Sequence, residues 1–238
     1  MKTTLTLISS MATRQLLAEL ALAFEQHSGP AMSVVVESVG GVDAARRVQG
    51  GEVFDVVLLA ADAIHKLLAS GAALPGSRVD IVRSPMAVAA AAGSSAVAIH
   101  TEDELKAAVL NAPSLGYSTG PSGSHLLRLF ERWGMADTVR PRLRQAPPGV
   151  PVAALVARGD AALGFQQLSE LVLEPGVQVL GELPPGAAFI TTFAGALCQR
   201  CTQLDAAREL LQYLAAPHTA AAKQRHGMLP AEPGLTQT

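Results

Sequence analysis

One stretch of the sequence gathers small, hydroxyl-bearing and ionisable residues at close spacing: GYSTGPSGSH, which ends at His125. We expect a strand end, a tight turn and then a helix, because the proline cannot donate a hydrogen bond and leucines follow at helical spacing. The first N–H groups of a helix have no intrahelical partner and lie at the positive end of its dipole. The hydroxyls of Ser118, Ser122 and Ser124 add further donors. Together with the backbone at Gly123 they predict an anion-binding site. The alternative is an ordinary turn whose serines only cap the helix.

His125 is the one residue of this stretch that could take up a proton near neutral pH. A helix N-terminus lowers a histidine pKa, so the neutral ring would accept a proton from a bound ligand. His125 is therefore a candidate catalytic acid/base. The alternative is a histidine that faces solvent or only orients the ligand.

Two arginines and a glutamine are further candidates for binding a carboxylate. Arg14 follows the first predicted strand, Arg83 lies on a segment that joins two blocks of the chain, and Gln166 follows a short strand. The planar guanidinium group suits a carboxylate because it can donate two parallel hydrogen bonds. The alternatives are ordinary salt bridges for the arginines and a strand-end cap for Gln166.

The N-terminal part of the chain alternates between strands and helices. Strands are predicted over 5–8, 33–36 and 54–59, with helices between them, which is typical of a doubly wound parallel sheet. Ligands bind such sheets at the carboxyl ends of the strands. The residues that follow these strands are candidates for ligand binding: Ser9, Ser10, Ser38, Gly40 and Ala61. The alternative for the serines is that they cap the following helices.

The rest of the chain repeats this alternation and suggests two lobes. Pro85 interrupts an apolar run and favours an edge or crossing strand, and the Thr101–Glu104 spacing predicts a capping box. We expect lobe 1 to comprise 1–83 and 188–238, and lobe 2 to comprise 84–187. Further elements are predicted as strands at 115–118, 161–165, 177–180 and 189–197, and as helices at 43–49, 152–157, 204–214 and 220–225.

The composition narrows the class of protein. The chain has 238 residues, of which 49% are hydrophobic and 16% charged, with a net charge of -2, which indicates a packed globular protein. This small net charge gives no reason to expect nucleic acid or a membrane as a partner.

The Cys198-Gln199-Arg200-Cys201 motif has no second pair of ligands elsewhere, so we expect it to be structural. We predict no metal and no cofactor.

The N-terminal residues lead directly into the first predicted strand. No basic segment followed by an apolar segment and a small-residue cleavage site precedes that strand. We therefore expect the chain as written to be cytoplasmic, and periplasmic if a leader was removed.

The order of several short motifs resembles one family along nearly the whole chain. The motifs are Ser9-Ser10, Ser38-Val39-Gly40-Gly41, and the segments 55–62, 159–165 and 206–217. They resemble the periplasmic molybdate-binding proteins and their relatives. The resemblance implies an α/β, two-lobed type II periplasmic-binding-protein fold, in which each lobe is a mostly parallel sheet flanked by helices. It also implies a ligand cleft between the lobes and closure by a hinge motion.

In that family, serine hydroxyls and backbone N–H groups hold a tetrahedral oxyanion. Carried over by position, the resemblance implies that the residues facing the cleft are Ser10, Ser38, Ala61, Ser122 and the backbone of Gly123 to His125. The sequence departs from the pattern because glutamines replace a tyrosine after the Gly-Phe segment, and because Arg14 and Arg83 suit a carboxylate better than an oxyanion.

The resemblance leaves two functions open. The first is binding of a small oxyanion or organic acid, with an ABC permease as the partner if the chain is exported. The second is isomerisation of a small unsaturated polycarboxylate such as aconitate, with His125 as the acid/base, because the family has relatives that catalyse this reaction.

Overall fold

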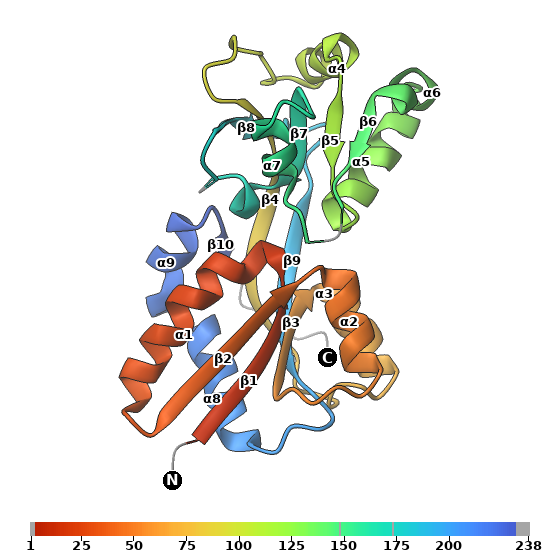
Figure 1. Cartoon of the computed structure of the whole chain (residues 1–238). Helices are drawn as coiled ribbons and strands as arrows, with labels where there is room; N and C mark the ends of the chain where they lie inside the picture. Colours follow the sequence, from red (N-terminus) through yellow and green to blue (C-terminus); the bar gives the residue numbers. More distant parts are fainter. Residues whose placement is uncertain (1–2, 148, 173, 232–238) are drawn as a thin grey trace. The chain divides into compact units, whose positions relative to one another are not determined.

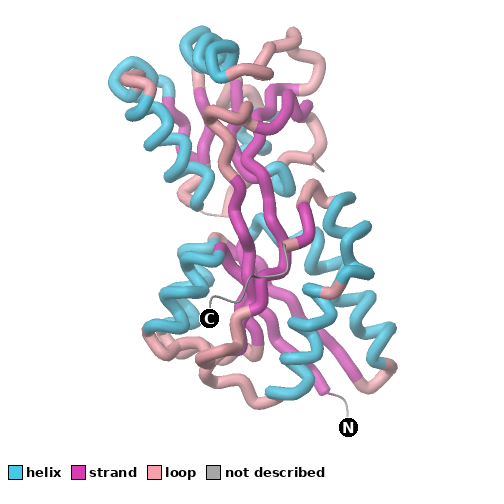
Figure 2. Tube along the Cα trace, turned by 180° about the vertical axis from the view of Figure 1, so that it is seen from behind, coloured by secondary structure: helices cyan, strands magenta, loops and turns pink. Residues whose placement is uncertain are grey.

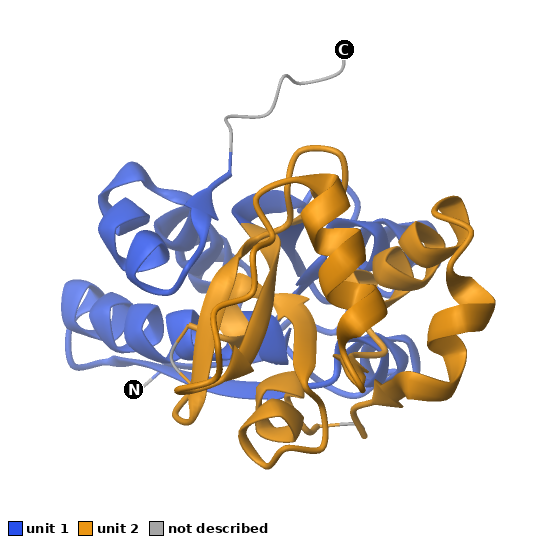
Figure 3. Ribbon diagram, turned by 90° about the horizontal axis from the view of Figure 1, so that it is seen from above, with its two compact units in different colours: residues 1–83, 192–238 blue, residues 84–191 orange. Residues whose placement is uncertain are grey.

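The computed structural model describes residues 3–147, 149–172 and 174–231. The chain divides into two compact units, which Figure 3 shows in different colours. Unit 1 comprises residues 1–83 and 192–238, and unit 2 comprises residues 84–191. The second division falls after Thr191, whereas the sequence analysis placed it after residue 187. In both units the strands form the centre and helices cover the two faces of the sheet (Figure 2).

The sheet of unit 1 is built around three parallel strands. These are β1 (Thr3–Ser10), β2 (Met32–Val39) and β3 (Val56–Ala60), in the order β2-β1-β3. The strand β9 (Ile190–Leu197) pairs antiparallel with β3. The β1–β2 register places Ser9 opposite Ser38. Because β1 and β3 also run in parallel, the carboxyl ends of all three strands lie at the same edge of the sheet.

Helices cover both faces of this sheet (Figure 1). On one face lie α1 (Arg14–Ser28), α8 (Leu204–Ala215) and α9 (Ala220–Arg225), whose apolar residues form one core with Leu5 and Leu7 of β1. On the other face lie α2 (Gly41–Gln49) and α3 (Ala61–Ala69), which pack on a core that includes Ile8. The alternation of leucine and isoleucine along β1 thus supplies both cores.

Unit 2 has a second sheet with its own parallel strands. Its order is β4-β7-β5-β6, from β4 (Val79–Ala91), β7 (Leu163–Gln167), β5 (Leu115–Tyr117) and β6 (Leu143–Gln145). The strands β5, β6 and β7 are parallel, and β4 pairs antiparallel with β7 and with β8 (Val177–Glu182). The carboxyl end of β5 therefore lies between the carboxyl ends of two parallel neighbours.

The helices of unit 2 also lie on both faces. On one face, α4 (Glu102–Asn111), α5 (Pro121–Arg132) and α6 (Ala136–Val139) share a core with Phe165 of β7. On the other face lies α7 (Val152–Ala157), which packs with residues of β4. The remaining short elements are 3-10 turns at Met11–Thr13, Arg140–Arg142, Leu168–Glu170 and Pro217–Thr219, and β10 (Leu229–Pro230), which pairs with β4.

Most predicted elements are present, with several corrections. The capping box of α4 is confirmed, since Thr101 accepts from the Glu104 N–H at 3.2 Å and the Glu104 carboxylate accepts from the Thr101 N–H at 3.1 Å. The strand predicted at 161–165 begins at Leu163, because residues before it form the turn after α7. The short elements α3, α6 and β6 were not predicted.

The apolar run around Pro85 is a single long strand that belongs to both units. The strand β4 leaves unit 1 after Arg83, and β9 returns to it after Thr191. Pro85 lies between the residues that pair with β10 and those that pair with β7, so its missing N–H removes no bond from either pairing. No helix in the described part of the chain is long and apolar enough to cross a membrane.

Candidate functional site

In unit 1, three predicted candidates lie where parallel strands end and helices begin. Ser10 ends β1, Gly40 precedes the first residue of α2, and Ala61 is the first residue of α3. A Cβ atom built on Gly41 would lie 3.5 Å from the Cβ of Ser10, so the N-terminus of α2 lies directly against Ser10. The structure thus brings Ser10 together with helix N–H groups that have no intrahelical partner.

The Ser10 hydroxyl is buried without a hydrogen bond. Ser10 is only 7% exposed, and its Oγ has no partner among the described residues. It does not cap the helical turn that follows it, so the capping alternative does not apply. A buried hydroxyl without a partner costs about 1–3 kcal/mol. An anion bound next to the N-terminus of α2 would give this hydroxyl an acceptor.

Ser9 and Ser38 form a pair beside Ser10. Their hydroxyl oxygens are 2.8 Å apart, and Ser9 donates to the Ser10 carbonyl at 3.3 Å. Since the one hydrogen of Ser9 is then used, Ser38 donates to Ser9 and keeps free lone pairs. Ser9 is fully buried. Its hydroxyl therefore fixes the ends of β1 and β2 relative to each other.

The two arginine candidates have different surroundings in unit 1. Arg14 is the first residue of α1 and its side chain is exposed. Arg83 is half-buried on β4, where its backbone pairs with Leu229 of β10. Only one 3-10 turn separates the end of β1 from the start of α1. Arg14 therefore lies at the same end of the sheet as Ser10.

In unit 2, the stretch after β5 forms the predicted turn and helix. The hydroxyl oxygens of Ser118 and Ser122 lie 3.2 Å apart, and the Gly120 N–H donates to the Ser118 hydroxyl at 3.4 Å. No serine side chain caps α5, whose N-cap is Gly120. Ser122 is buried and Ser124 is exposed.

The turn requires a glycine at residue 123. A Cβ atom there would lie 1.7 Å from the Ser118 carbonyl oxygen, a distance that no side chain can occupy. The close approach of α5 to the end of β5 is therefore possible only because Gly123 has no Cβ atom.

His125 is held by contacts on one side of its ring. Its Nε2 lies 3.1 Å from the Ala187 carbonyl oxygen, and its ring stacks on Phe189 with centroids 4.3 Å apart. Because a carbonyl can only accept, Nε2 carries the hydrogen and Nδ1 is the proton acceptor of the neutral ring. Burial lowers the pKa of His125, the bond to Ala187 partly raises it, and Arg128 and Arg132 lower it further. The ring is therefore neutral at pH 7.

The candidate Gln166 uses both ends of its side chain inside unit 2. Its Oε1 accepts from the Val152 N–H at 2.8 Å, and its Nε2 donates to Glu170 at 2.7 Å. Its neighbour Gln167 is also 2% exposed and donates to the Thr191 hydroxyl at 2.6 Å, while its Oε1 has no partner among the described residues. Gln167 is thus a candidate that the sequence analysis missed, because alternation along β7 shows only that the two glutamines face opposite ways.

The cysteine motif lies after β9. Burial raises the pKa of Cys198 to about 12 and also raises the pKa of Cys201, and both are free thiols. Among the described residues, no group of three or more His, Cys, Asp or Glu side chains could hold a metal ion.

The fold and these clusters place the chain in a known class. It belongs to the family of bacterial extracellular solute-binding proteins, whose family model matches residues 5–229. A curated relative, the aconitate isomerase of a Pseudomonas species, is 38% identical over 237 residues, which is 97% of this chain and 90% of that protein.

Solved structures show the same fold at low sequence identity. The periplasmic molybdate-binding protein of Azotobacter vinelandii superposes with a TM-score of 0.79 at 19% identity, covering 96% of this chain and all of that one. The sulfate-binding protein SubI of Mycobacterium tuberculosis gives 0.77 at 16% identity, covering 97% and 88%. The predicted family resemblance and the type II periplasmic-binding fold are therefore confirmed.

Proposed function

We propose that this chain binds a small anion that carries carboxylate or oxyanion groups. The observation that carries the proposal is the buried Ser10 hydroxyl, which has no partner in the described part of the chain and lies against the N-terminus of α2. The family is one of solute-binding proteins, and a relative with 38% identity is named for aconitate, a small polycarboxylate. We therefore favour a polycarboxylate over a bare oxyanion.

Unit 2 supplies a second group of residues suited to a small anion. Ser118, Ser122 and the backbone at Gly123 lie at the start of α5, a helix of 12 residues, and the Gln167 side chain is buried with one end unpaired. We propose that these residues bind the same class of ligand. In a binding role outside the cell membrane, the partner would be an ABC permease, because the family comprises extracellular solute-binding proteins and similar solved structures belong to molybdenum and tungstate ABC transporters.

A panel of ligands tests the proposal by thermal unfolding. Molybdate, tungstate, sulfate, citrate, cis-aconitate and trans-aconitate are each added to the full chain. A ligand at one hundred times its Kd adds about 2.7 kcal/mol of stability, which is about 5–10 °C for a chain of this size. Stabilisation by the carboxylates alone supports the preferred ligand class, and stabilisation by oxyanions alone contradicts it. If no member of the panel shifts the transition, anion binding is wrong.

A second candidate function is isomerisation of the bound polycarboxylate. The specific observation is the fixed His125 ring, whose Nδ1 is a neutral proton acceptor. In a 1,3-proton shift, Nδ1 takes a proton from the CH₂ carbon of the ligand while the double bond moves. The protonated ring then delivers a proton, which can exchange with solvent, to the carbon at the other end of the allylic system, so that no oxidant or cofactor is consumed.

The isomerase candidate is tested by deuterium incorporation into cis-aconitate in D₂O, followed by NMR. We expect the His125→Gln variant to lose at least 100-fold of the rate, since a general acid/base contributes about 10²–10⁴. The exposed His100 provides the matched control, His100→Gln, which should keep the full rate. Because the pKa of His125 is lowered, the rate should fall only below about pH 6.5. Exchange that persists in His125→Gln would remove this histidine from the mechanism.

A further inference from the structure

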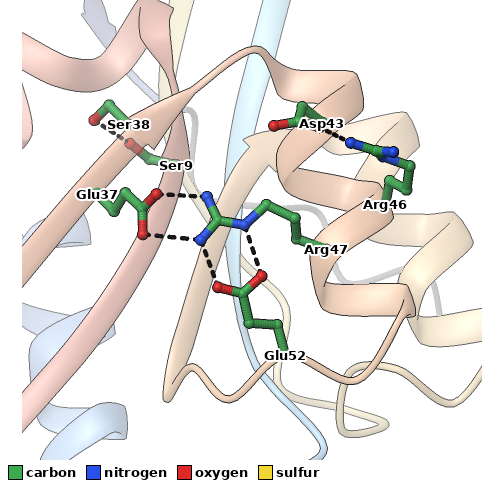
Figure 4. Close-up of polar contacts among 7 residues, drawn as sticks. All are labelled: Ser9, Glu37, Ser38, Asp43, Arg46, Arg47 and Glu52. Atoms are coloured by element: carbon green, nitrogen blue, oxygen red, sulfur yellow. Dashed lines mark hydrogen bonds and ion pairs between the residues drawn. The ribbon is translucent and has the colours of Figure 1, made fainter.

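Arg47 joins two carboxylates at the outer side of α2 (Figure 4). Its guanidinium group binds Glu52 through Nε at 2.7 Å and through Nη2, and binds Glu37 through Nη1 and through Nη2 at 3.0 Å. We call Arg47, Glu37 and Glu52 the Arg47 clamp. Two bidentate pairs on one guanidinium group fix its orientation more strongly than a single surface contact does. The guanidinium group also lies 5.3 Å from the centre of the Phe54 ring.

The clamp connects α2 to β2 at a point next to the site. Glu37 directly precedes Ser38 in β2, and Arg47 lies in the last turn of α2. The N-terminus of α2 is attached to β2 through Gly40, so the clamp fixes the same helix a second time, near its other end. Figure 4 shows the Ser9–Ser38 pair and the clamp on the same part of β2.

The buried apolar face of α2 is small. Its two buried side chains are those of Ala44 and Val48, which offer little apolar surface compared with the leucine-rich helices of this unit. A short helix with a small apolar face has little to define its tilt. We propose that Arg47 is a positioning residue that aims the first N–H groups of α2 at the anion beside Ser10.

This inference rests on the proposed function. In it, the clamp acts by holding α2 in place and not by attracting the charge of the ligand. The clamp has one positive and two negative groups, so its net charge would repel an anion rather than attract it. An isolated ion pair on the surface contributes little to stability. The Arg47 side chain differs from that case, because it is only 21% exposed and takes part in two ion pairs. Positioning and electrostatics therefore predict opposite results when Glu37 is removed.

The experiment compares three variants of the full chain in titrations with cis-aconitate. Glu37→Thr removes a negative charge and breaks the clamp, and Arg47→Lys keeps the charge but loses the bidentate geometry. Arg208→Gln is the control, because it removes an exposed arginine that pairs with Asp205 of the same helix, α8. We expect affinity to fall about tenfold in the first two variants, and to change less than twofold in the control. Tighter binding by Glu37→Thr, or full affinity in Arg47→Lys, would overturn the proposal.

Amide hydrogen exchange gives a readout that needs no ligand. In the free protein, the amides of residues 44–48 in α2 should exchange at least fivefold faster in Glu37→Thr and Arg47→Lys, and at the original rate in Arg208→Gln. Unchanged exchange in the first two variants would show that the clamp does not hold the helix. If the unsubstituted protein binds no member of the ligand panel, the proposed function fails, while the exchange rates still decide whether Arg47 positions α2.

Discussion

At the scale of single residues, the unpaired Ser10 hydroxyl separates a binding role from a structural one. Ser10→Ala removes a buried hydroxyl that has no hydrogen-bond partner within the described residues, so the free energy of unfolding should stay the same or rise by up to about 1 kcal/mol. Ligand affinity should fall about tenfold or more, because a hydrogen bond to a charged group is worth about 1.5–3 kcal/mol. Urea unfolding measures the free energy of unfolding, and titration with cis-aconitate measures the ligand affinity.

Ser28 provides a matched control for this prediction. Its hydroxyl is also buried without a partner among the described residues, but it lies in the last residue of α1, at the far end of that helix from Ser10. Ser28→Ala should therefore leave ligand affinity unchanged. A Ser10→Ala protein that unfolds more easily and binds as before would show that this serine only supports the fold.

At the scale of elements, the turn between β5 and α5 depends on Gly123. Gly123→Ala would place a methyl group 1.7 Å from a backbone oxygen, which can move only if the turn moves with it. We expect a loss of about 1–3 kcal/mol or more in stability, as in other overpacked sites. Gly120→Ala is the control, because its added Cβ atom would lie 3.6 Å from the nearest atom, the Ser118 hydroxyl oxygen. Equal urea midpoints for the two variants would contradict this account of the turn.

Elements with a clear local pattern were predictable from the sequence, and contacts between distant residues were not. The spacing of Thr101 and Glu104 defined the start of α4, and serines after parallel strands indicated one edge of a sheet. The choice between Gln166 and Gln167 depends on Val152 and Thr191, which belong to other segments of the chain. The Arg47 clamp could not be predicted either, since nothing in the order of residues shows which carboxylates this arginine reaches.

At the scale of the whole molecule, the C-terminal segment completes unit 1 and brings a buried lysine with it. Lys223 of α9 is 1% exposed and has no ion-pair partner among the described residues. Burial lowers the pKa of Lys223 from 10.5 to about 8. Between these values the unfolded chain binds a proton that the folded chain does not bind, so stability rises with pH through this window. Below about pH 8 the folded protein carries the cost of a buried ammonium group.

Lys223→Met should remove that cost and keep most of the side-chain volume. At pH 7 we expect the variant to be more stable by about 1–3 kcal/mol, since the folded protein then no longer buries a charged ammonium group. The advantage should shrink as the pH rises from 8 toward 10.5, where the lysine of the original protein becomes neutral in both states. Urea unfolding at several pH values measures this difference, with the exposed Lys66→Met as the control. A variant that is less stable at pH 7 would mean that the ammonium group has a favourable role, and a constant difference across the pH range would mean that its charge is not the cause.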